Sequence, residues 1–166
     1  MSFGIRPAKI LMLFYEKIWL ECCDHLSAFT INDIRYELNE DAMWLEILVR
    51  KPNRSMNIQT GAILSVGLKF YYEYDFGTTT HLTLRVLSEQ KAAIKDKSIQ
   101  ILARNDQPRI SCEVCGEFAT QVCRKCIHRG EGRLCEKCAK EHSCGRDMFL
   151  PVVNSPRVGI CGYTGD

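Results

Sequence analysis

Seven cysteines and two histidines lie in one short stretch of the chain, between residues 112 and 144. Three Cys-x2-Cys pairs and one His-x-Cys pair can be recognised in it. A Cys-x2-Cys pair on a tight turn directs both sulfurs at one ion, and zinc then needs two more ligands to complete a tetrahedron. The four pairs supply eight ligands, which predicts two zinc ions with no ligand left over.

The order of the pairs favours a cross-brace, in which the first and third pairs share one ion and the second and fourth share the other. The predicted ligands of the first zinc are Cys112, Cys115, Cys135 and Cys138, and those of the second are Cys123, Cys126, His142 and Cys144. A sequential arrangement is the alternative. His128, two residues after Cys126, is an alternative ligand.

The ligand types favour structural zinc. Hydrolytic zinc sites keep one position open for water, whereas four-cysteine and three-cysteine-one-histidine sites are closed and activate water poorly. The stretch has few large apolar residues, so we expect it to unfold when metal is removed. Its basic side chains are nearly cancelled by glutamates, which favours a solvated surface over a phosphate-binding one.

Residues 110–146 resemble a cross-braced B-box-type zinc finger, on the paired cysteines, the alanine at 119 and the segment LCEKCAKEH. The histidine stands at the end of the ligand series, whereas a RING finger has it in the middle. The resemblance therefore implies a module for protein contacts and not a ubiquitin ligase.

Length and composition describe a globular chain that can bury a core of its own. The chain has 166 residues, 46% hydrophobic and 25% charged, with a formal net charge of +2. This charge predicts no strong attraction to nucleic acid or to acidic membranes. The apolar run 10–14 is too short to span a membrane, so we expect a soluble, cytoplasmic protein that uses its cysteines for metal rather than disulfides.

Periodicity predicts several elements. Apolar residues spaced three and four apart predict a helix over 8–23, with Cys22 and Cys23 as buried free thiols. Alternation predicts a hairpin turning at Asn32-Asp33, a strand over 44–49, a hairpin with an aromatic face at 70–76 and partner residues 82–86, and a strand over 98–105. Residues 58–66 are ambiguous between helix and strand, and 91–97 form a basic linker.

These elements predict an α+β protein with an antiparallel sheet, an N-terminal helix packed on it and a small cross-braced zinc-finger insert. The expected scaffold domain comprises residues 1–109 and 147–166, with the apolar tail packed on the main body. The insert comprises residues 110–146.

The segment YYEYDFGTTTHLTL contains a DFG triplet, but the other kinase motifs are missing, and a hairpin with Asp75 at a strand end and Gly77 in the turn explains it better. The segment is similar to the YDFG strand of the plasmid pRiA4b Orf-three-like family. WLECCDHLSAF and LPVVNSPRVGICGYTG resemble flanking segments in a zinc-finger-bearing branch of uncharacterised prokaryotic proteins. The resemblance implies an α+β scaffold with the finger inserted before the final segment, and no established activity.

One departure from that family bears on function. The family tends to continue YDFG with Asp, Trp and His, whereas Thr78–Thr80 follow here and His81 falls out of register. We expect a binding or adaptor protein with a protein partner and no enzymatic activity. The alternatives are a nucleic-acid-associated protein linked to mobile elements and, less favoured, an enzyme that uses Glu73, Asp75, His81 and Arg85.

Overall fold

The computed structural model describes residues 7–20, 23–38, 53–90 and 99–165. They form a mixed α+β structure that divides into two compact units. Unit 1 comprises Met1–Tyr15 and His25–Gln100, and unit 2 comprises Glu16–Asp24 and Ile101–Asp166. Within the described residues, no helix is long and apolar enough to cross a membrane.

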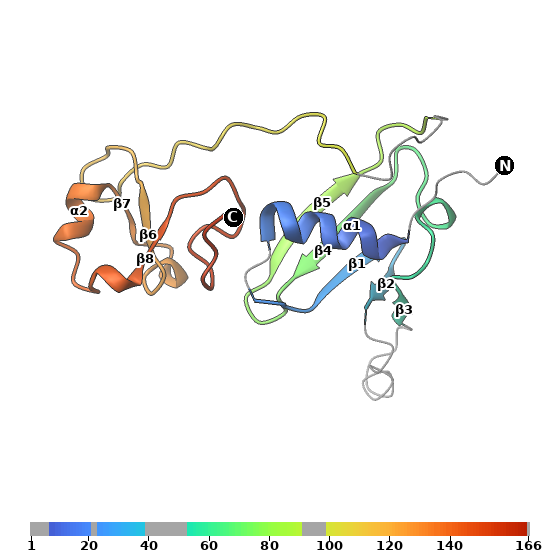
Figure 1. Ribbon diagram of the computed structural model, residues 1–166, viewed down its shortest axis with the longest axis horizontal. Coiled ribbons are helices and arrows are strands. Elements are labelled where there is room, and N and C mark those ends of the chain that lie inside the picture. Colours follow the sequence, from blue (N-terminus) through green and yellow to red (C-terminus); the bar gives the residue numbers. More distant parts are fainter. Residues whose placement is uncertain (1–6, 21–22, 39–52, 91–98, 166) are drawn as a thin grey trace. The chain divides into compact units, whose positions relative to one another are not determined.

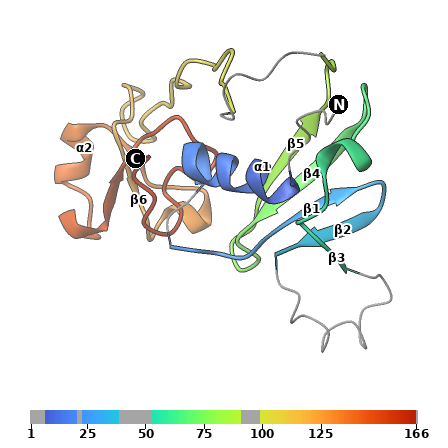
Figure 2. The ribbon, with the colours of Figure 1, turned by 45° about the vertical axis from the view of Figure 1, so that its right-hand side comes forward.

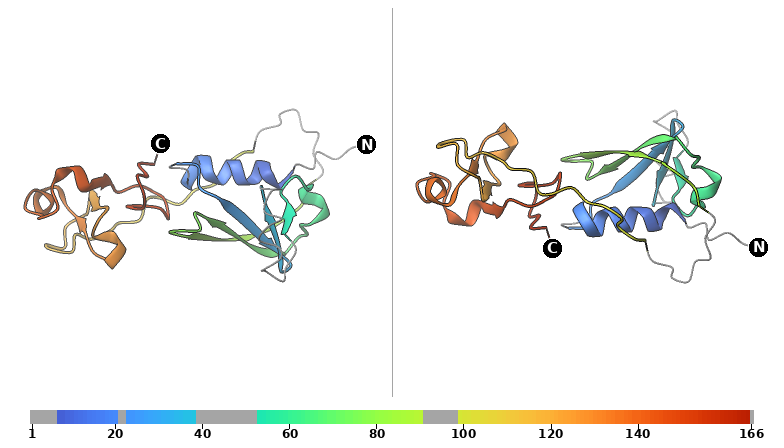
Figure 3. Two further views of the ribbon diagram at one scale, coloured as in Figure 1. Left: turned by 90° about the horizontal axis from the view of Figure 1, so that it is seen from below. Right: turned by 90° about the horizontal axis from the view of Figure 1, so that it is seen from above.

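Unit 1 is built on a five-stranded sheet with the order β3-β2-β1-β4-β5. The strands are β1 (Ser27–Ile31), β2 (Ile34–Glu37), β3 (Asn53–Ser55), β4 (Lys69–Tyr74) and β5 (Thr80–Arg85). All neighbours are antiparallel except β2 and β3. The helix α1 (Ala8–Tyr15) lies along one face of this sheet (Figures 1 and 3). This is the expected α+β arrangement of helix and sheet.

The hairpin between β1 and β2 turns at Asn32 and Asp33. Their φ angles are 51° and 62°, and Ile31 faces Ile34 across the turn. Two-residue hairpin turns of type I′ need positive φ at both central residues, which Asn and Asp tolerate better than other side chains. The predicted two-residue turn is confirmed.

The DFG triplet lies in the connection between β4 and β5. Asp75 follows the end of β4 with φ 62°. Its Oδ1 accepts hydrogen bonds from the backbone N–H groups of Gly77 (3.1 Å) and Thr78 (3.2 Å). The carboxylate therefore closes the turn. Asp75 at the strand end and Gly77 in the turn are as the hairpin interpretation predicted.

Aromatic side chains fill the core of unit 1. The ring centroid of Phe29 is 4.6 Å from that of Tyr72 and 6.1 Å from that of Phe70. From α1, the ring of Tyr15 lies 6.0 Å from that of Tyr72. The expected aromatic face of β4 is thus buried, whereas Phe76, also expected on it, is exposed because it lies in the turn after the strand.

The N-terminal helix differs from the expected one. α1 ends at Tyr15 and is followed by a π-helical turn, η1 (Glu16–Leu20), which groups with unit 2. The buried residues recur every four positions and are Ala8, Met12, Glu16 and Leu20. The apolar residues whose spacing predicted the helix include those at 11, 14, 15, 18 and 19, and these five are only partly buried. Residues 10–15 are all apolar, so their spacing alone did not single out the buried face.

Unit 2 contains a three-stranded sheet with the order β7-β6-β8 and several short helices. Figure 1 labels the three strands, and Figure 2 shows β6 and α2 from another side. Its strands are β6 (Gln121–Cys123), β7 (Arg133–Leu134) and β8 (Phe149–Pro151), and its helices after residue 101 are η4 (Ile127–Arg129), α2 (Glu136–Lys140) and η5 (Arg146–Met148). Both outer strands run antiparallel to β6.

The C-terminal tail belongs to unit 2. The sequence had placed residues 147–166 in the scaffold, but β8 pairs with β6 of the finger. Gly159 packs so closely on β6 that a Cβ at this position would lie 2.6 Å from Val122 Cγ1. Strands of two or three residues carry too little alternation to reveal this pairing in sequence.

The strand expected over 98–105 is absent from its described part, residues 99–105. This segment contacts the tail through side chains instead. Arg104 Nη2 donates to Asn154 O (2.7 Å), and Asn154 Nδ2 donates to Asn105 O (2.8 Å).

Of the other expectations, residues 58–66 contain one short helix, η3 (Thr60–Ala62). The strand at 44–49, the linker at 91–97 and Cys22 lie outside the described residues.

Candidate metal centres

The first candidate centre joins a turn to the helix α2. Cys112 and Cys115 lie on a turn in which Gly116 has φ 78° and its N–H donates to Cys112 O (2.9 Å). Cys135 caps the N-terminus of α2, and Cys138 lies one turn into that helix. The four sulfur atoms lie within 4.8 Å of one another. Leu134, Ala139 and Phe149 pack against this cluster.

The second candidate centre gathers residues around the end of β6. Cys123 is the last residue of β6, and Cys126 precedes η4. His142 and Cys144 come from the segment after α2. The ligand atoms of these four residues again lie within 4.8 Å of one another. The structure therefore brings the eight predicted ligands together in two sets of four, with the first pair joined to the third and the second to the fourth, which is the cross-braced grouping.

The spacing of the ligand atoms fits a tetrahedral ion. With zinc–sulfur bonds of about 2.3 Å and zinc–nitrogen bonds of about 2.0 Å, a tetrahedron has S–S edges of about 3.8 Å and S–N edges of about 3.5 Å. The Sγ atoms of Cys115 and Cys135 are 3.6 Å apart, and those of Cys126 and Cys144 are 3.7 Å apart. Nε2 of His142 lies 3.5 Å from Cys126 Sγ. These sulfurs are not joined as disulfides, whose S–S bond is about 2.05 Å long.

Backbone donors stabilise a thiolate in the first cluster. Burial raises the pKa of Cys112, but hydrogen bonds from backbone N–H groups, including those of Cys135 and Cys115, outweigh it and set the pKa at about 6. The neighbouring sulfurs raise the pKa of Cys138 instead. The four neighbouring sulfurs therefore cannot all be thiolates at once without a cation. A bound metal ion would replace their protons and compensate the negative charge of the thiolates.

The second cluster has the same pattern. Burial raises the pKa of Cys123, but backbone N–H groups of Cys126 and Lys125 and the His142 side chain lower it to about 7. For Cys126, burial and the sulfurs of Cys144 and Cys123 raise the pKa to about 11. A divalent metal ion suits this arrangement because it would stabilise all of these sulfurs as thiolates.

Glu113 ties the two clusters together. Its Oε2 accepts a hydrogen bond from the N–H of Gly132 (2.6 Å), and its Oε1 accepts one from Arg133 Nη1 (3.0 Å). Gly132 in turn has φ 95° and lies against Cys123 and Cys126, where a Cβ would meet their Cβ atoms at 3.0 and 2.8 Å. The turn of the first cluster is therefore fastened to the backbone that packs on the second.

His128 does not join either cluster. It is exposed on η4, outside both four-residue sets. Cys23, expected as a buried thiol, is instead exposed, and its Sγ lies 3.3 Å from that of Cys161. Sequence reasoning missed this pair because single cysteines 138 positions apart carry no spacing signal.

The four residues considered for an enzyme site near the β4–β5 hairpin make separate contacts. Glu73 and His81 face each other across β4 and β5, with Nδ1 of His81 3.5 Å from Glu73 Oε1. Glu73 also pairs with Arg35. Asp75 is buried in its own turn and lies 3.5 Å from His25 Nε2. Arg85 faces Lys69 at the far end of the hairpin.

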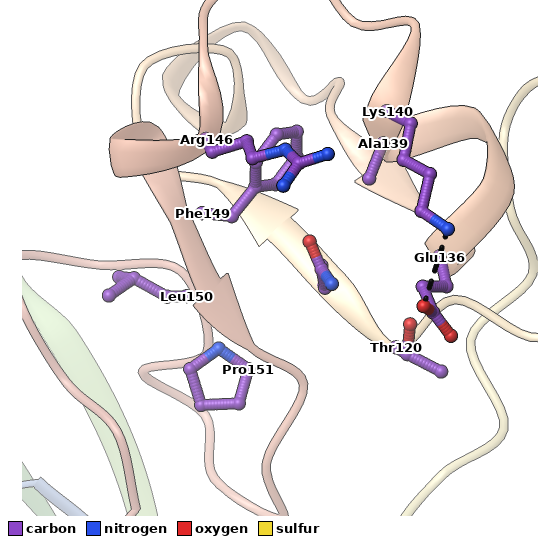
Figure 4. A pocket seen from close by; sticks show the side chains of 9 residues that line it. Thr120, Glu136, Ala139, Lys140, Arg146, Phe149, Leu150 and Pro151 are labelled. Carbon is purple, nitrogen blue, oxygen red and sulfur yellow. Dashed lines mark ion pairs between the residues drawn. The ribbon is translucent and has the colours of Figure 1, made fainter.

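Unit 2 also has an open concave surface of about 640 Å³ beside α2 and β8 (Figure 4). Its lining comprises Thr120, Gln121, Glu136, Ala139, Lys140, Arg146, Phe149, Leu150 and Pro151. Lys140 Nζ pairs with Glu136 Oε1 at 3.6 Å. Arg146 forms no ion pair with any of the described residues.

Comparison of the chain with protein-family models, with curated proteins and with solved structures found no match.

Proposed function

We propose that the chain is a zinc protein with two structural ions and that its finger binds a protein partner. The two complete four-ligand sets are the observation that carries the proposal. Tetrahedral sites of four thiolates, or of three thiolates and an imidazole, suit zinc among the common divalent ions. Metal analysis of the purified chain tests this part, with two zinc ions per chain as the expected result.

A structural role follows from the complete ligand sets. Each ion would be enclosed by four protein ligands, which leaves no position for water or substrate. The buried apolar residues around them are few, mainly Val122, Leu134 and Ala139. Apparent binding energies of about 10–16 kcal/mol per structural zinc would compensate for so small a core.

Partner binding would use the concave surface beside α2 and β8. Its apolar part includes Phe149 and Leu150, and Glu136 and Lys140 neutralise each other. The remaining charge in the lining is Arg146, whose guanidinium suits a carboxylate by bidentate hydrogen bonding. We therefore propose a peptide ligand that carries an acidic residue beside an apolar one.

A peptide library selected on the zinc-loaded chain tests this surface. Peptides that combine acidic and apolar residues should be enriched, and Arg146→Glu should weaken them at least about tenfold. Lys125→Glu is the matched control, since it makes the same charge reversal on an exposed residue of the finger outside the concave surface. Equal loss with both variants would indicate general charge attraction and would contradict the proposal.

The double variant Cys123→Ser, Cys126→Ser tests whether the finger or the scaffold binds the partner. Loss of the partner together with zinc would place binding in unit 2, and a retained partner would place it in unit 1. Salt-sensitive binding of DNA or RNA by the intact chain would instead favour the nucleic-acid alternative. We also propose membership of the pRiA4b Orf-three-like family, in a branch that carries the zinc finger, and we assign no catalytic role to Glu73, Asp75 or His81.

A further inference from the structure

Two exposed thiols from distant parts of the chain lie together in unit 2. The Sγ atoms of Cys23 and Cys161 are 3.3 Å apart, although 138 positions separate these residues in sequence. Both side chains are exposed. Neither belongs to the two four-ligand clusters, so neither is needed as a ligand of the two proposed zinc ions.

The tail on which Cys161 lies is anchored on both sides. Before it, Ser155 Oγ donates to the backbone oxygen of Trp19 (2.6 Å), which ties the tail to the segment that leads to Cys23. Gly159 packs on β6 without room for a side chain. After it, Tyr163 is 3% exposed. These contacts bring the two thiols together before any bond forms between them, which lowers the entropic cost of joining them.

A tight turn directs Cys161 outward between these anchors. The N–H of Tyr163 donates to Ile160 O (3.1 Å), and Cys161 has φ 55°. Turn positions with positive φ favour Gly, Asn or Asp, and other residues are strained there. A cysteine is therefore poorly suited to this turn on local grounds, and its thiol faces a second thiol instead.

We propose that Cys23 and Cys161 form a reversible intramolecular disulfide by exchange with a glutathione-type disulfide. One cysteine thiolate attacks a sulfur of the glutathione disulfide and releases one glutathione thiolate. The second cysteine thiolate then attacks the mixed disulfide and releases the other. The protein loses two electrons and two protons, and the oxidant is reduced to two molecules of glutathione. Closure requires the sulfurs to approach from 3.3 Å to about 2 Å.

The product would fasten the segment around Cys23 to the C-terminal tail of unit 2. Because zinc would hold the finger thiols as ligands, oxidation should select the exposed pair. This selectivity depends on the proposed zinc sites, whereas formation of the disulfide does not.

The test uses the full zinc-loaded chain treated with excess glutathione disulfide. Intact mass should fall by two hydrogen atoms while two zinc ions remain bound in native mass spectra, and peptide mapping should find Cys23 joined to Cys161. Cys23→Ser and Cys161→Ser should each abolish the internal bond and retain glutathione on the remaining cysteine. Cys22→Ser is the matched control and should behave like the unmodified chain.

Four results would overturn the proposal: a lasting glutathione adduct on the unsubstituted chain, a disulfide that uses Cys22, a dimer linked between chains, or a third zinc ion that both serine variants lose. Failure of the zinc proposal gives a different result. The chain would then contain fewer than two zinc ions before oxidation, and the Cys23–Cys161 peptide would still be found.

Discussion

Replacing Gly132 by alanine should weaken metal binding at the second centre, and the same replacement at Gly130 controls for backbone strain. Gly130 and Gly132 lie in the same loop, with φ angles of 81° and 95°. A Cβ at Gly130 meets nothing within 4 Å, whereas one at Gly132 lies 2.8 Å from Cys126 Cβ and 3.0 Å from Cys123 Cβ. Alanine at either position has the same kind of backbone cost, and only one of them collides with ligands.

The magnitudes follow from these contacts. A left-handed conformation costs an alanine about 1–2 kcal/mol, and this applies to both variants. Overpacking a tight site adds about 1–3 kcal/mol, which applies to Gly132→Ala alone. If the added energy opposes the bound geometry of Cys123 and Cys126, zinc should bind the second centre about 5- to 150-fold more weakly than in Gly130→Ala.

Competition with a chromophoric zinc chelator measures this difference. Gly130→Ala should release its two ions at chelator concentrations close to those of the unsubstituted chain, and Gly132→Ala should release one ion early. Native mass spectra of the half-released sample should contain one zinc per chain. If both variants retain both ions equally well, the close approach of Gly132 to the ligand cysteines does not control metal binding.

Three further predictions concern the two units. Strong chelation should collapse the NMR dispersion of the finger between 112 and 151 and leave the sheet of unit 1 dispersed; unchanged finger signals would contradict the structural role of the metal. Phe29→Ala removes a fully buried ring and should destabilise unit 1 by about 3–5 kcal/mol in urea, against about 1 kcal/mol or less for the exposed Tyr71→Ala. Burial raises the pKa of Tyr15 above 10.0, so its neutral phenol contributes stability that is complete below pH 10 and is lost as the pH rises through the folded pKa. Tyr15→Phe should therefore reduce the alkaline loss of stability of unit 1, and an unchanged pH profile would assign that loss to other groups.

Local chemistry made much of unit 1 predictable. Asn32 and Asp33 accept the positive φ of a two-residue turn, and alternation along β4 separates the buried Phe70 and Tyr72 from the exposed Tyr71. The parallel pairing of β2 with β3 was not predictable, because β3 has three residues and its partner is chosen by tertiary contacts.

The two four-residue clusters were predictable because tetrahedral metal sites need a fixed number of ligands, which short Cys-x2-Cys spacings supply in pairs. The surroundings of the ligands were not. Nothing in the spacing indicates that Glu113 reaches Gly132, or that Thr120 and Arg146 line the same concave surface. These contacts join residues that are distant in sequence, so no local pattern records them.

For the two zinc ions that we propose, the interleaved order of the ligands also constrains when each centre can form during synthesis. As the chain leaves the ribosome, Cys123 and Cys126 emerge before Cys135 and Cys138 complete the first set, and they still await His142 and Cys144. A nascent chain that has completed the first ligand set, but has not reached residue 144, still exposes Cys123 and Cys126 without their two partner ligands. A stalled or truncated chain would therefore present reactive thiols, and the finger can mature only when translation has passed residue 144.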